Sequence, residues 1–270
     1  METSVERVAE LERANYAATA TSARVTPNLE VTLRDDVILT SSTGFPTPDS
    51  NHACQLRADD QTVDDLIAEV TGHFQTKGLP VAIYVSPACT PRYLPKMLLE
   101  RGFSKGNEKE TWMVLERLSN FDLPSPYPDI PVRSITKEEA NVFAEVFLTA
   151  FDIPSGFAPL MAQLLRPSVE LPTVHHYLAF YEHKPVGTCS LLRHESFGVL
   201  GSVGVLTEQR GRGAATNMAI RALIDARERG IDTLMLQTTA DTPLERFLRI
   251  SGFRRAFTRS CYTLNDGFPG

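Results

Sequence analysis

The sequence predicts an α/β fold made of two domains of one kind, each with a mixed, mostly antiparallel sheet flanked by helices. Three observations lead to this prediction. The second half of the 270-residue chain has the pattern of a strand meander followed by alternating helices and strands. A segment with four prolines in thirteen residues, Ser119–Pro131, separates it from the first half. The two halves also end in closely similar segments.

In the second half, hydrophobic periodicity distinguishes strands from helices. Strands are expected at Val132–Ser134, His176–Tyr181, Val186–Arg193, Gly198–Leu206, Thr233–Thr238 and Phe257–Leu264. Helices are expected at Lys137–Ala150, Ala158–Leu165, Gly213–Arg229 and Thr242–Ile250. The polar segment Glu182–Pro185 is expected to join two adjacent strands as a hairpin turn. This order gives a mixed sheet with helices on both faces.

The first half is less regular. A helix is expected at Val5–Ala18, strands within Leu29–Thr40 and a second helix at Val63–Lys77. The turn-rich loop Ser41–His52 is unusually long for a connector. It either covers a cleft or is a plain surface loop, and both interpretations remain open at this point.

The similar endings are Leu94–Leu115 and Leu244–Leu264. Each contains a short amphipathic helix, then Gly-Phe, then an alternating strand with an aromatic residue ten positions after the glycine. Because the two glycines lie 150 residues apart, we expect two copies of one fold. The expected domains are residues 1–118 and 132–270, joined by an extended linker at 119–131.

Composition and charge restrict the classes of function. The net charge of −6 argues against a nucleic-acid partner, although residues 210–260 carry ten Lys and Arg against five Asp and Glu. Such a local basic field suits a small polyanion. The N-terminus lacks the apolar region of a signal peptide, and no apolar run is long enough to cross a bilayer. With four scattered cysteines, the sequence predicts a cytoplasmic protein without a membrane partner or a metal site.

The segment "TEQRGRGAAT", Thr207–Thr216, gives the strongest functional signal. Gly211 and Gly213 allow a sharp turn and a close approach of a ligand to the backbone. The helix that follows directs the free N–H groups of residues 212–216 out of its positive end. With Arg210 and Arg212 beside them, these donors predict a phosphate or pyrophosphate site. The lysine of the Walker pattern and the third glycine of the Rossmann pattern are missing.

This segment resembles motif A of the GNAT superfamily, the acetyl-CoA-dependent N-acetyltransferases. The family form V-x-P-x-x-R-G-x-G-x-G/A corresponds to Val205–Ala215, with Thr207 in place of the proline and Ala215 in place of the last glycine. The strand "TLMLQTT" and the final helix, Gly-Phe and strand are also similar, so the resemblance covers Ile130–Leu264. The repeated ending implies two GNAT-like domains, of which the first, without an R-G-x-G loop, is degenerate.

The resemblance implies that acetyl-CoA is the cosubstrate and that its acetyl group passes to a primary amine, of a small molecule or a peptide, by direct attack. It assigns the cofactor to Val203, Val205, Leu206, Arg210, Gly211, Arg212, Gly213, Ala214, Ala215 and Thr216. The strand residues would contact the pantetheine arm, and the loop and helix residues would hold the pyrophosphate. A non-catalytic acyl-CoA-binding module is the alternative, and nucleotide binding is a third, less consistent possibility.

The residues that move protons are not identified by the sequence. In the family, a tyrosine that protonates the thiolate often lies four residues before the glycine of Gly-Phe, but Leu248 occupies that position here, as Leu98 does in the first copy. The weak catalytic candidates are Glu195, Ser202 and Tyr262. Each also has a structural explanation. Glu195 would belong to a solvated turn, the Ser202 hydroxyl would bond the local backbone, and Tyr262 would be a core residue.

Four residues near the expected short helix either line an acceptor pocket or belong to a packed amphipathic helix: Phe151, Asp152, Phe157 and Met161. The neighbours His175 and His176 are expected on opposite faces of a strand, and Cys189 in the core. The two copies are expected to form either a monomer with pseudo-dimeric halves or a homodimer.

Overall fold

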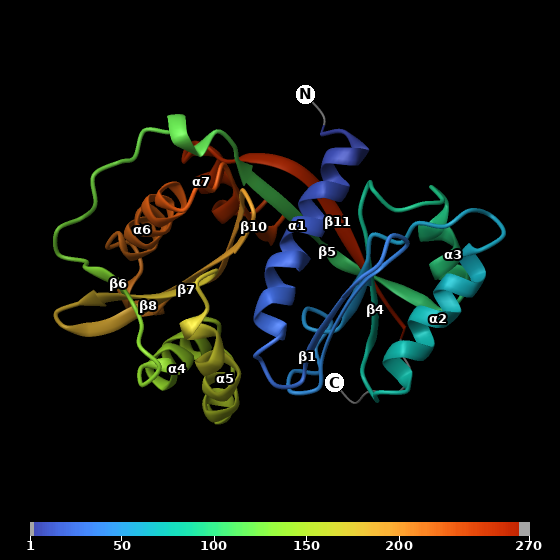
Figure 1. Cartoon of the computed structure of the whole chain (residues 1–270), viewed down its shortest axis with the longest axis horizontal. Coiled ribbons are helices and arrows are strands. Elements are labelled where there is room, and N and C mark those ends of the chain that lie inside the picture. The colour runs from blue at the N-terminus through green and yellow to red at the C-terminus, as the bar shows by residue number, and fades with distance from the viewer. Residues whose placement is uncertain (1–2, 265–270) are drawn as a thin grey trace. The chain divides into compact units, whose positions relative to one another are not determined.

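The computed structural model describes residues 3–264 and has the mixed α/β architecture that the sequence predicts (Figure 1). The first half contains α1 (Val5–Ala23), β1 (Leu29–Leu33), β2 (Ile38–Ser42), β3 (His52–Cys54), α2 (Val63–Gln75), β4 (Val81–Val85), α3 (Leu94–Glu100) and β5 (Phe103–Leu115). The second half contains β6 (Val132–Ser134), α4 (Ala140–Ala150), α5 (Ala158–Leu165), β7 (Val174–Tyr181), β8 (Lys184–His194), β9 (Phe197–Val205), α6 (Ala214–Glu228), β10 (Thr233–Thr239), α7 (Pro243–Ile250) and β11 (Arg254–Leu264). Short 3-10 helices lie at Leu118–Asn120, Ser155–Phe157, Arg166–Glu170 and Thr207–Gln209.

The contacts within the chain divide it into two compact units. Unit 1 comprises Met1–Arg24, Asn28–Val114 and Gln237–Gly270, of which residues 1–2 and 265–270 lie outside the described part. Unit 2 comprises Val25–Pro27 and Leu115–Leu236. Contact units and copies of a fold are different things, so the division into domains 1–118 and 132–270 stays a prediction.

Unit 2 contains a mixed sheet with the strand order β10-β9-β8-β7-β6. The β9–β10 pair is parallel and the others are antiparallel. Helix α6 covers one face, and α4 and α5 cover the other (Figure 1). The face under α4 and α5 carries a buried apolar cluster that includes Phe143, Ala144 and Leu178. Because α6 packs on this sheet and follows β9 in the chain, its N-terminus lies close to the C-terminal end of β9.

Unit 1 contains the strand order β1-β2-β3-β4-β11-β5, with β3 and β4 parallel. Alternate residues of its strands point to opposite faces. Leu39, Ala53 and Ile83 pack under α2 and α3, and Ile38 and Tyr84 belong to a second cluster with Tyr16 of α1. Both faces of this sheet are therefore covered.

The repeated endings form equivalent structures. Gly102 after α3 and Gly252 after α7 have φ angles of +87° and +93°, the left-handed conformation that glycine adopts without strain. The strands that follow, β5 and β11, pair with one another antiparallel, so that Phe103 lies opposite Leu264. The C-terminal strand is thus part of the same compact unit as the first half of the chain.

Several predicted boundaries are corrected by the structure. Helix α1 continues to Ala23, and within its last turns Thr19 and Thr21 donate their hydroxyls to carbonyls four residues earlier. Helix α4 starts at Ala140 instead of Lys137, since the Glu139 carboxylate accepts the N–H of Thr136 and turns the chain first. The ends of the loop predicted at Ser41–His52 belong to β2 and β3.

The proline-rich segment Ser119–Pro131, called the strap below, runs along α6 within unit 2 (Figure 1). At its start, the Arg227 guanidinium donates to the carbonyls of Leu118, Ser119 and Phe121. At its end, Asn217 exchanges hydrogen bonds with the N–H and C=O of Tyr127 and donates to the carbonyl of Ile130, all at 2.7–2.8 Å. After the 3-10 helix at its start, the strap has no regular secondary structure, and it is fastened to α6 near both ends.

Unit 1 buries a charged cluster. The Arg259 guanidinium, 5% exposed, donates to Glu110 at 2.7 Å and to the Tyr16 hydroxyl at 2.9 Å, and it lies 4.2 Å from the Tyr84 ring centroid. Burial raises the pKa of Glu12, the nearby carboxyl of α1, to about 7. A buried cation needs such partners to offset its desolvation, so this cluster joins α1, β4, β5 and β11 in one arrangement.

No helix within residues 3–264 combines the length and the apolar character needed to cross a bilayer.

In unit 2, His176 is a core residue. It is 7% exposed, and its ring nitrogens lie 2.9 Å from the Ser168 hydroxyl and 2.7 Å from the Ser190 hydroxyl. Burial lowers the pKa of His176 to about 4, because the charged imidazolium loses its hydration. The neutral ring therefore links the 3-10 turn before β7 to strand β8.

We predict that His176 makes the protein less stable in acid. Its pKa is about 4 when folded against an ordinary 6.5, so the unfolded chain binds more protons between these values, and stability falls as the pH drops through this range. Between pH 7 and 5 the loss amounts to about 2 kcal/mol. Urea denaturation of the wild type and of His176→Gln at both pH values measures it. The variant should lose about 2 kcal/mol less, and equal pH dependences would contradict the prediction.

Candidate functional site

Strand β9 leads into the start of α6 through a tight loop. A single 3-10 turn, Thr207–Gln209, is followed by Gly211 and Gly213 with φ angles of +78° and +94°. These left-handed angles let the chain reverse and enter α6 with Gly213 as the N-cap residue. The Arg-Gly loop therefore lies at a helix N-terminus, as the sequence predicts.

The loop and the first turn of α6 leave a row of donors unpaired. Within the described residues 3–264, the first backbone N–H that finds an acceptor here is that of Asn217, 2.9 Å from the Gly213 carbonyl. The six preceding N–H groups, from Gly211 to Thr216, have none. Because they sit at the positive end of α6, they form a ready site for an anion, called the nest below. Gly211, Arg212 and Ala215 are exposed, so a ligand can reach it.

The two arginines of the loop are anchored differently. Arg210 donates through Nε to the Val205 carbonyl at 3.1 Å and through Nη2 to the Ala150 carbonyl at 3.2 Å. Arg212 lies over the Tyr181 ring at 4.8 Å and donates to its hydroxyl at 3.3 Å. A guanidinium has five N–H donors, so each arginine retains donors for a phosphate. Arg210 also ties the loop to the end of α4.

Strand β9 is irregular just before the loop. Its pairing with β8 shifts by one residue between Gly201 and Gly204, and Ser202 has a φ of +53°, which defines a β-bulge. The Thr188 hydroxyl holds the bulge by donating to the Ser202 carbonyl at 2.8 Å. Bulges of this kind redirect a strand and end its pairing on one side.

The pairing of β9 with β10 ends before this bulge. It covers only Phe197–Val199 opposite Thr233–Met235, although β9 continues to Val205. Among the described residues, the edge of β9 beyond Val199 therefore lacks a ladder partner on the β10 side. Unpaired backbone N–H and C=O groups on a strand edge can bond an extended ligand chain.

The strand residues predicted to contact the pantetheine arm lie along this edge or just after it. Val203 is 40% exposed and Val205 is half-buried. Leu206 follows the strand, and its N–H already bonds the Val186 carbonyl at 3.0 Å, so Leu206 can offer a ligand only its side chain at that point. Val203 and Val205 are the better placed of the three.

The three weak catalytic candidates lie in different places. Ser202 is the bulge residue itself and is half-exposed. Glu195 is an exposed residue of the β8–β9 turn, seven residues before Ser202, which corresponds to about 20 Å along a strand. Tyr262 is 4% exposed within the apolar cluster of unit 1. Of the three, Ser202 alone lies on β9 next to the Arg-Gly loop, and all three catalytic assignments stay predictions.

The other polar residues of the sequence analysis have structural surroundings. Cys189 is fully buried, and burial raises the pKa of its thiol to about 12, which keeps it protonated. Leu98 and Leu248, where family members often carry a tyrosine, are both buried. At these two positions the chain offers no hydroxyl to a thiolate.

The residues expected near an acceptor lie around the end of α4. Phe151 is 46% exposed and packs against Gly204, where a Cβ would come within 2.7 Å of its ring. Phe157 is 41% exposed, and Met161 is half-buried against the cluster under α4 and α5. Asp152 has a φ of +55° and ends the helix turn. An exposed aromatic surface thus adjoins β9 next to the bulge.

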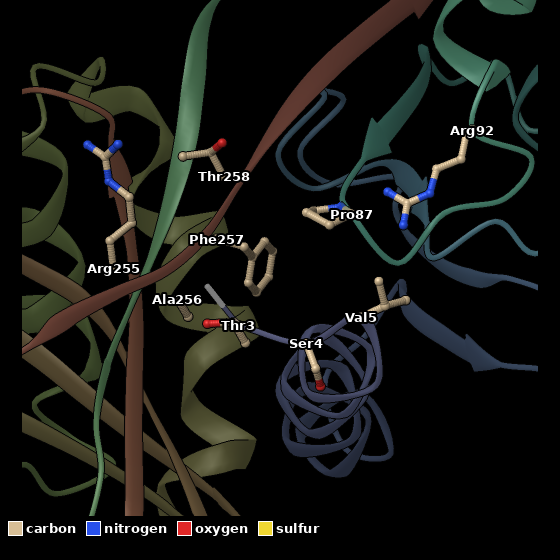
Figure 2. A pocket seen from close by; sticks show the side chains of 9 residues that line it. All are labelled: Thr3, Ser4, Val5, Pro87, Arg92, Arg255, Ala256, Phe257 and Thr258. Carbon is tan, nitrogen blue, oxygen red and sulfur yellow. The ribbon is translucent and has the colours of Figure 1, made fainter. Parts of the chain in front are cut away.

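Unit 1 carries a pocket of about 560 Å³ between the start of α1, the end of β4 and β11 (Figure 2). Phe257, Pro87 and Val5 line it with apolar surface. The Arg255 guanidinium is turned away in Figure 2 and is held by Glu245 and Asp241. The loop predicted at Ser41–His52 folds on itself elsewhere in this unit and is not among the lining segments.

Sequence reasoning missed three residues that shape the nest and the bulge: Tyr127, Thr188 and Asn217. Tyr127 was part of a segment assigned only as a linker. Asn217 gave a usable signal, because an amide beside the buried Ala214 and Met218 on the helix must find partners. Which partners it finds depends on residues ninety positions away, which periodicity does not show.

Comparisons with known proteins agree with this geometry. The sequence model of the acetyltransferase (GNAT) family matches residues 136–253, a segment that contains β9, the nest and α6. No curated protein matches the chain in sequence. The matched segment amounts to 118 of 270 residues, which is less than half of the chain.

Solved structures match over nearly the whole length. A GCN5-related N-acetyltransferase from Kribbella flavida has 15% identity and a TM-score of 0.70, covering 94% of this chain and 95% of that one. A tandem GNAT protein from the clavulanic acid biosynthesis pathway, without AcCoA, has 14% identity and a TM-score of 0.62, covering 94% and 88%. A GCN5-related N-acetyltransferase from Sphaerobacter thermophilus has 16% identity and a TM-score of 0.59, covering 88% and 84%. The chain therefore has the GNAT fold.

We predict that Asn217→Ala loosens the strap. The change removes three short hydrogen bonds made by a side chain that is 4% exposed, and it leaves backbone groups of the strap without partners. The expected loss of stability is about 2–3 kcal/mol, measured by urea denaturation, with faster proteolysis within residues 119–131. Asn141→Ala, at an exposed position of α4, is the control and should cost less than about 0.5 kcal/mol. Equal effects of the two changes would contradict the prediction.

Proposed function

We propose that this protein is an N-acetyltransferase that transfers an acetyl group from acetyl-CoA to a primary amine. The observation that carries the proposal is the row of six unpaired N–H groups at the start of α6, directly after a strand whose edge is open. The GNAT fold and the family match of residues 136–253 support it. Acetyl-CoA supplies the activated acyl group, as a thioester.

The residues present fit such a cosubstrate. The N–H groups of residues 211–216 and the remaining donors of Arg210 and Arg212 would hold the pyrophosphate. Val203 and Val205, on the open edge of β9, would pair with the amides of the pantetheine arm. Both sets of groups lie within one continuous stretch of chain, which fixes the distance between them.

The chain itself would mainly position the two reactants and donate hydrogen bonds to the thioester. Direct attack of a neutral amine on a thioester requires a hydrogen bond to the carbonyl oxygen as it gains negative charge. Backbone N–H groups at the open end of β9, after the Ser202 bulge, would provide this bond. The exposed ring of Phe151 would shield the reacting groups from water on the side of α4. The acceptor would be a small-molecule or peptide amine.

We further propose that only the second GNAT-like copy holds the cosubstrate. At the start of α2, the equivalent helix of the first copy, the Asp59 carboxylate already accepts the N–H groups of Gln61 and Thr62. Asp60, Asp64 and Asp65 add negative charge there. A pyrophosphate would be repelled from this helix end, which is consistent with a degenerate first copy.

We predict that Ala215→Glu abolishes cosubstrate binding. Ala215 is exposed in the first turn of α6, where a carboxylate favours the helix but repels a phosphate placed in the nest. By isothermal titration calorimetry, the dissociation constant of acetyl-CoA should rise at least about tenfold. Ala215→Gln, of the same size without the charge, should change it less than about threefold.

The result is decisive in either direction. Binding to the wild type that survives in the glutamine variant and is lost in the glutamate variant supports an anion in the nest. If acetyl-CoA does not bind the wild type, or if both variants weaken it equally, the proposed site is wrong.

A non-catalytic acyl-CoA-binding module is the second candidate, favoured by the buried leucine at position 248. Release of free thiol from acetyl-CoA in the presence of polyamine, amino-acid and peptide amines separates the two functions. Thiol release that depends on an amine indicates an acetyltransferase, whereas tight binding without turnover for any of these amines indicates the module.

A further inference from the structure

The strap brings an aromatic side chain onto the nest. Tyr127 lies against Gly213, so closely that a Cβ on this glycine would come within 2.5 Å of the Tyr127 ring. Since Gly213 also has a φ of +94°, two independent constraints require a glycine at this position. The ring of Tyr127 therefore borders the row of unpaired N–H groups.

The backbone of Tyr127 fastens the strap to α6. Its own backbone N–H and C=O make the hydrogen bonds with Asn217 at 2.8 Å, and Ile130 provides a further anchor. The side chain is left 53% exposed. A large aromatic ring fixed by its backbone and open to solvent beside an anion site is suited to contact a ligand.

The position of the ring indicates which part of the ligand it would contact. A pyrophosphate in the nest carries two substituents, the pantetheine arm and the nucleoside. The open edge of β9 offers partners to the pantetheine arm. Tyr127 instead belongs to the strap and borders the nest at Gly213, the N-cap residue of α6. Since the pantetheine arm is expected along β9, we expect the nucleoside on the side of Tyr127.

We propose that Tyr127 stacks against the nucleoside of the cosubstrate, so that the strap forms one wall of the binding site and makes the site selective for a nucleotide-bearing ligand. This inference rests on the proposed function. Stacking suits an adenine because every base has a flat π face.

The test compares two ligands by isothermal titration calorimetry: acetyl-CoA, and acetyl-4′-phosphopantetheine, which has the thioester arm and a phosphate but no nucleoside. Tyr127→Leu retains apolar packing on Gly213 and removes the π face, and Tyr127→Phe retains both. We expect Tyr127→Leu to weaken acetyl-CoA about tenfold and acetyl-4′-phosphopantetheine less than about twofold. Tyr127→Phe should bind both ligands as the wild type does. Tyr93→Ala, at an exposed tyrosine of unit 1, serves as the control.

Each outcome decides the inference. An equal loss of affinity for both ligands in Tyr127→Leu shows that the ring only supports the loop, and unchanged affinity for acetyl-CoA shows that the ring does not touch the nucleoside. Either result overturns the role of Tyr127 and leaves the proposed function intact. Failure of the wild type to bind acetyl-CoA overturns both.

Discussion

The unpaired backbone donors at the start of α6 are the feature on which the site depends. A side-chain cap can satisfy one of the first N–H groups of a helix and contributes about 1 kcal/mol. Helices α1 and α7 do this with Ser4 and Thr242, whose hydroxyls accept the N–H of Arg7 and Glu245. Helix α6 has Gly213 as its N-cap residue and no acidic residue in its first turn. It forgoes that stabilisation and keeps its positive end open for an anion.

The nest and the surface near the acceptor are coupled through a few contacts in unit 2. Arg210 links the loop to the last carbonyl of α4, and Phe151, the next residue, packs on Gly204 of β9. The Ser202 bulge lies two residues before Gly204 and is held by Thr188. A shift of the loop would thus move the end of α4 and the bulge together. The same contacts would therefore position both the groups that bind the cosubstrate and the groups near the amine. Acyl transfer depends on such an alignment of the two reactants.

Features that depend on neighbouring residues could be predicted from the sequence, whereas contacts between distant segments could not. The elements follow from periodicity and the Arg-Gly loop from residue type, because a helix, a strand or a glycine turn is determined mainly by near neighbours. The bulge at Ser202 was not predictable, since serine adopts a positive φ only where its surroundings impose it. The pairing of β11 with β4 and β5 was equally hidden, because its partner residues lie between 140 and 183 positions apart in the sequence. Tyr127 and Asn217 belong to this second group, so the part of the site formed by the strap became visible only in three dimensions.

The two halves of the chain share an order of elements but differ at one helix start. In both, a parallel pair of strands, β3–β4 or β9–β10, precedes a helix-Gly-Phe-strand ending. The helices that begin after β3 and β9 differ at their N-termini. Asp59 accepts the N–H groups of Gln61 and Thr62 just before α2, and two aspartates add negative charge in the first turn of that helix. At α6, Arg210 and the unpaired N–H groups instead favour an anion. Backbone geometry alone would make each helix start an anion site, and the side chains decide which one remains available.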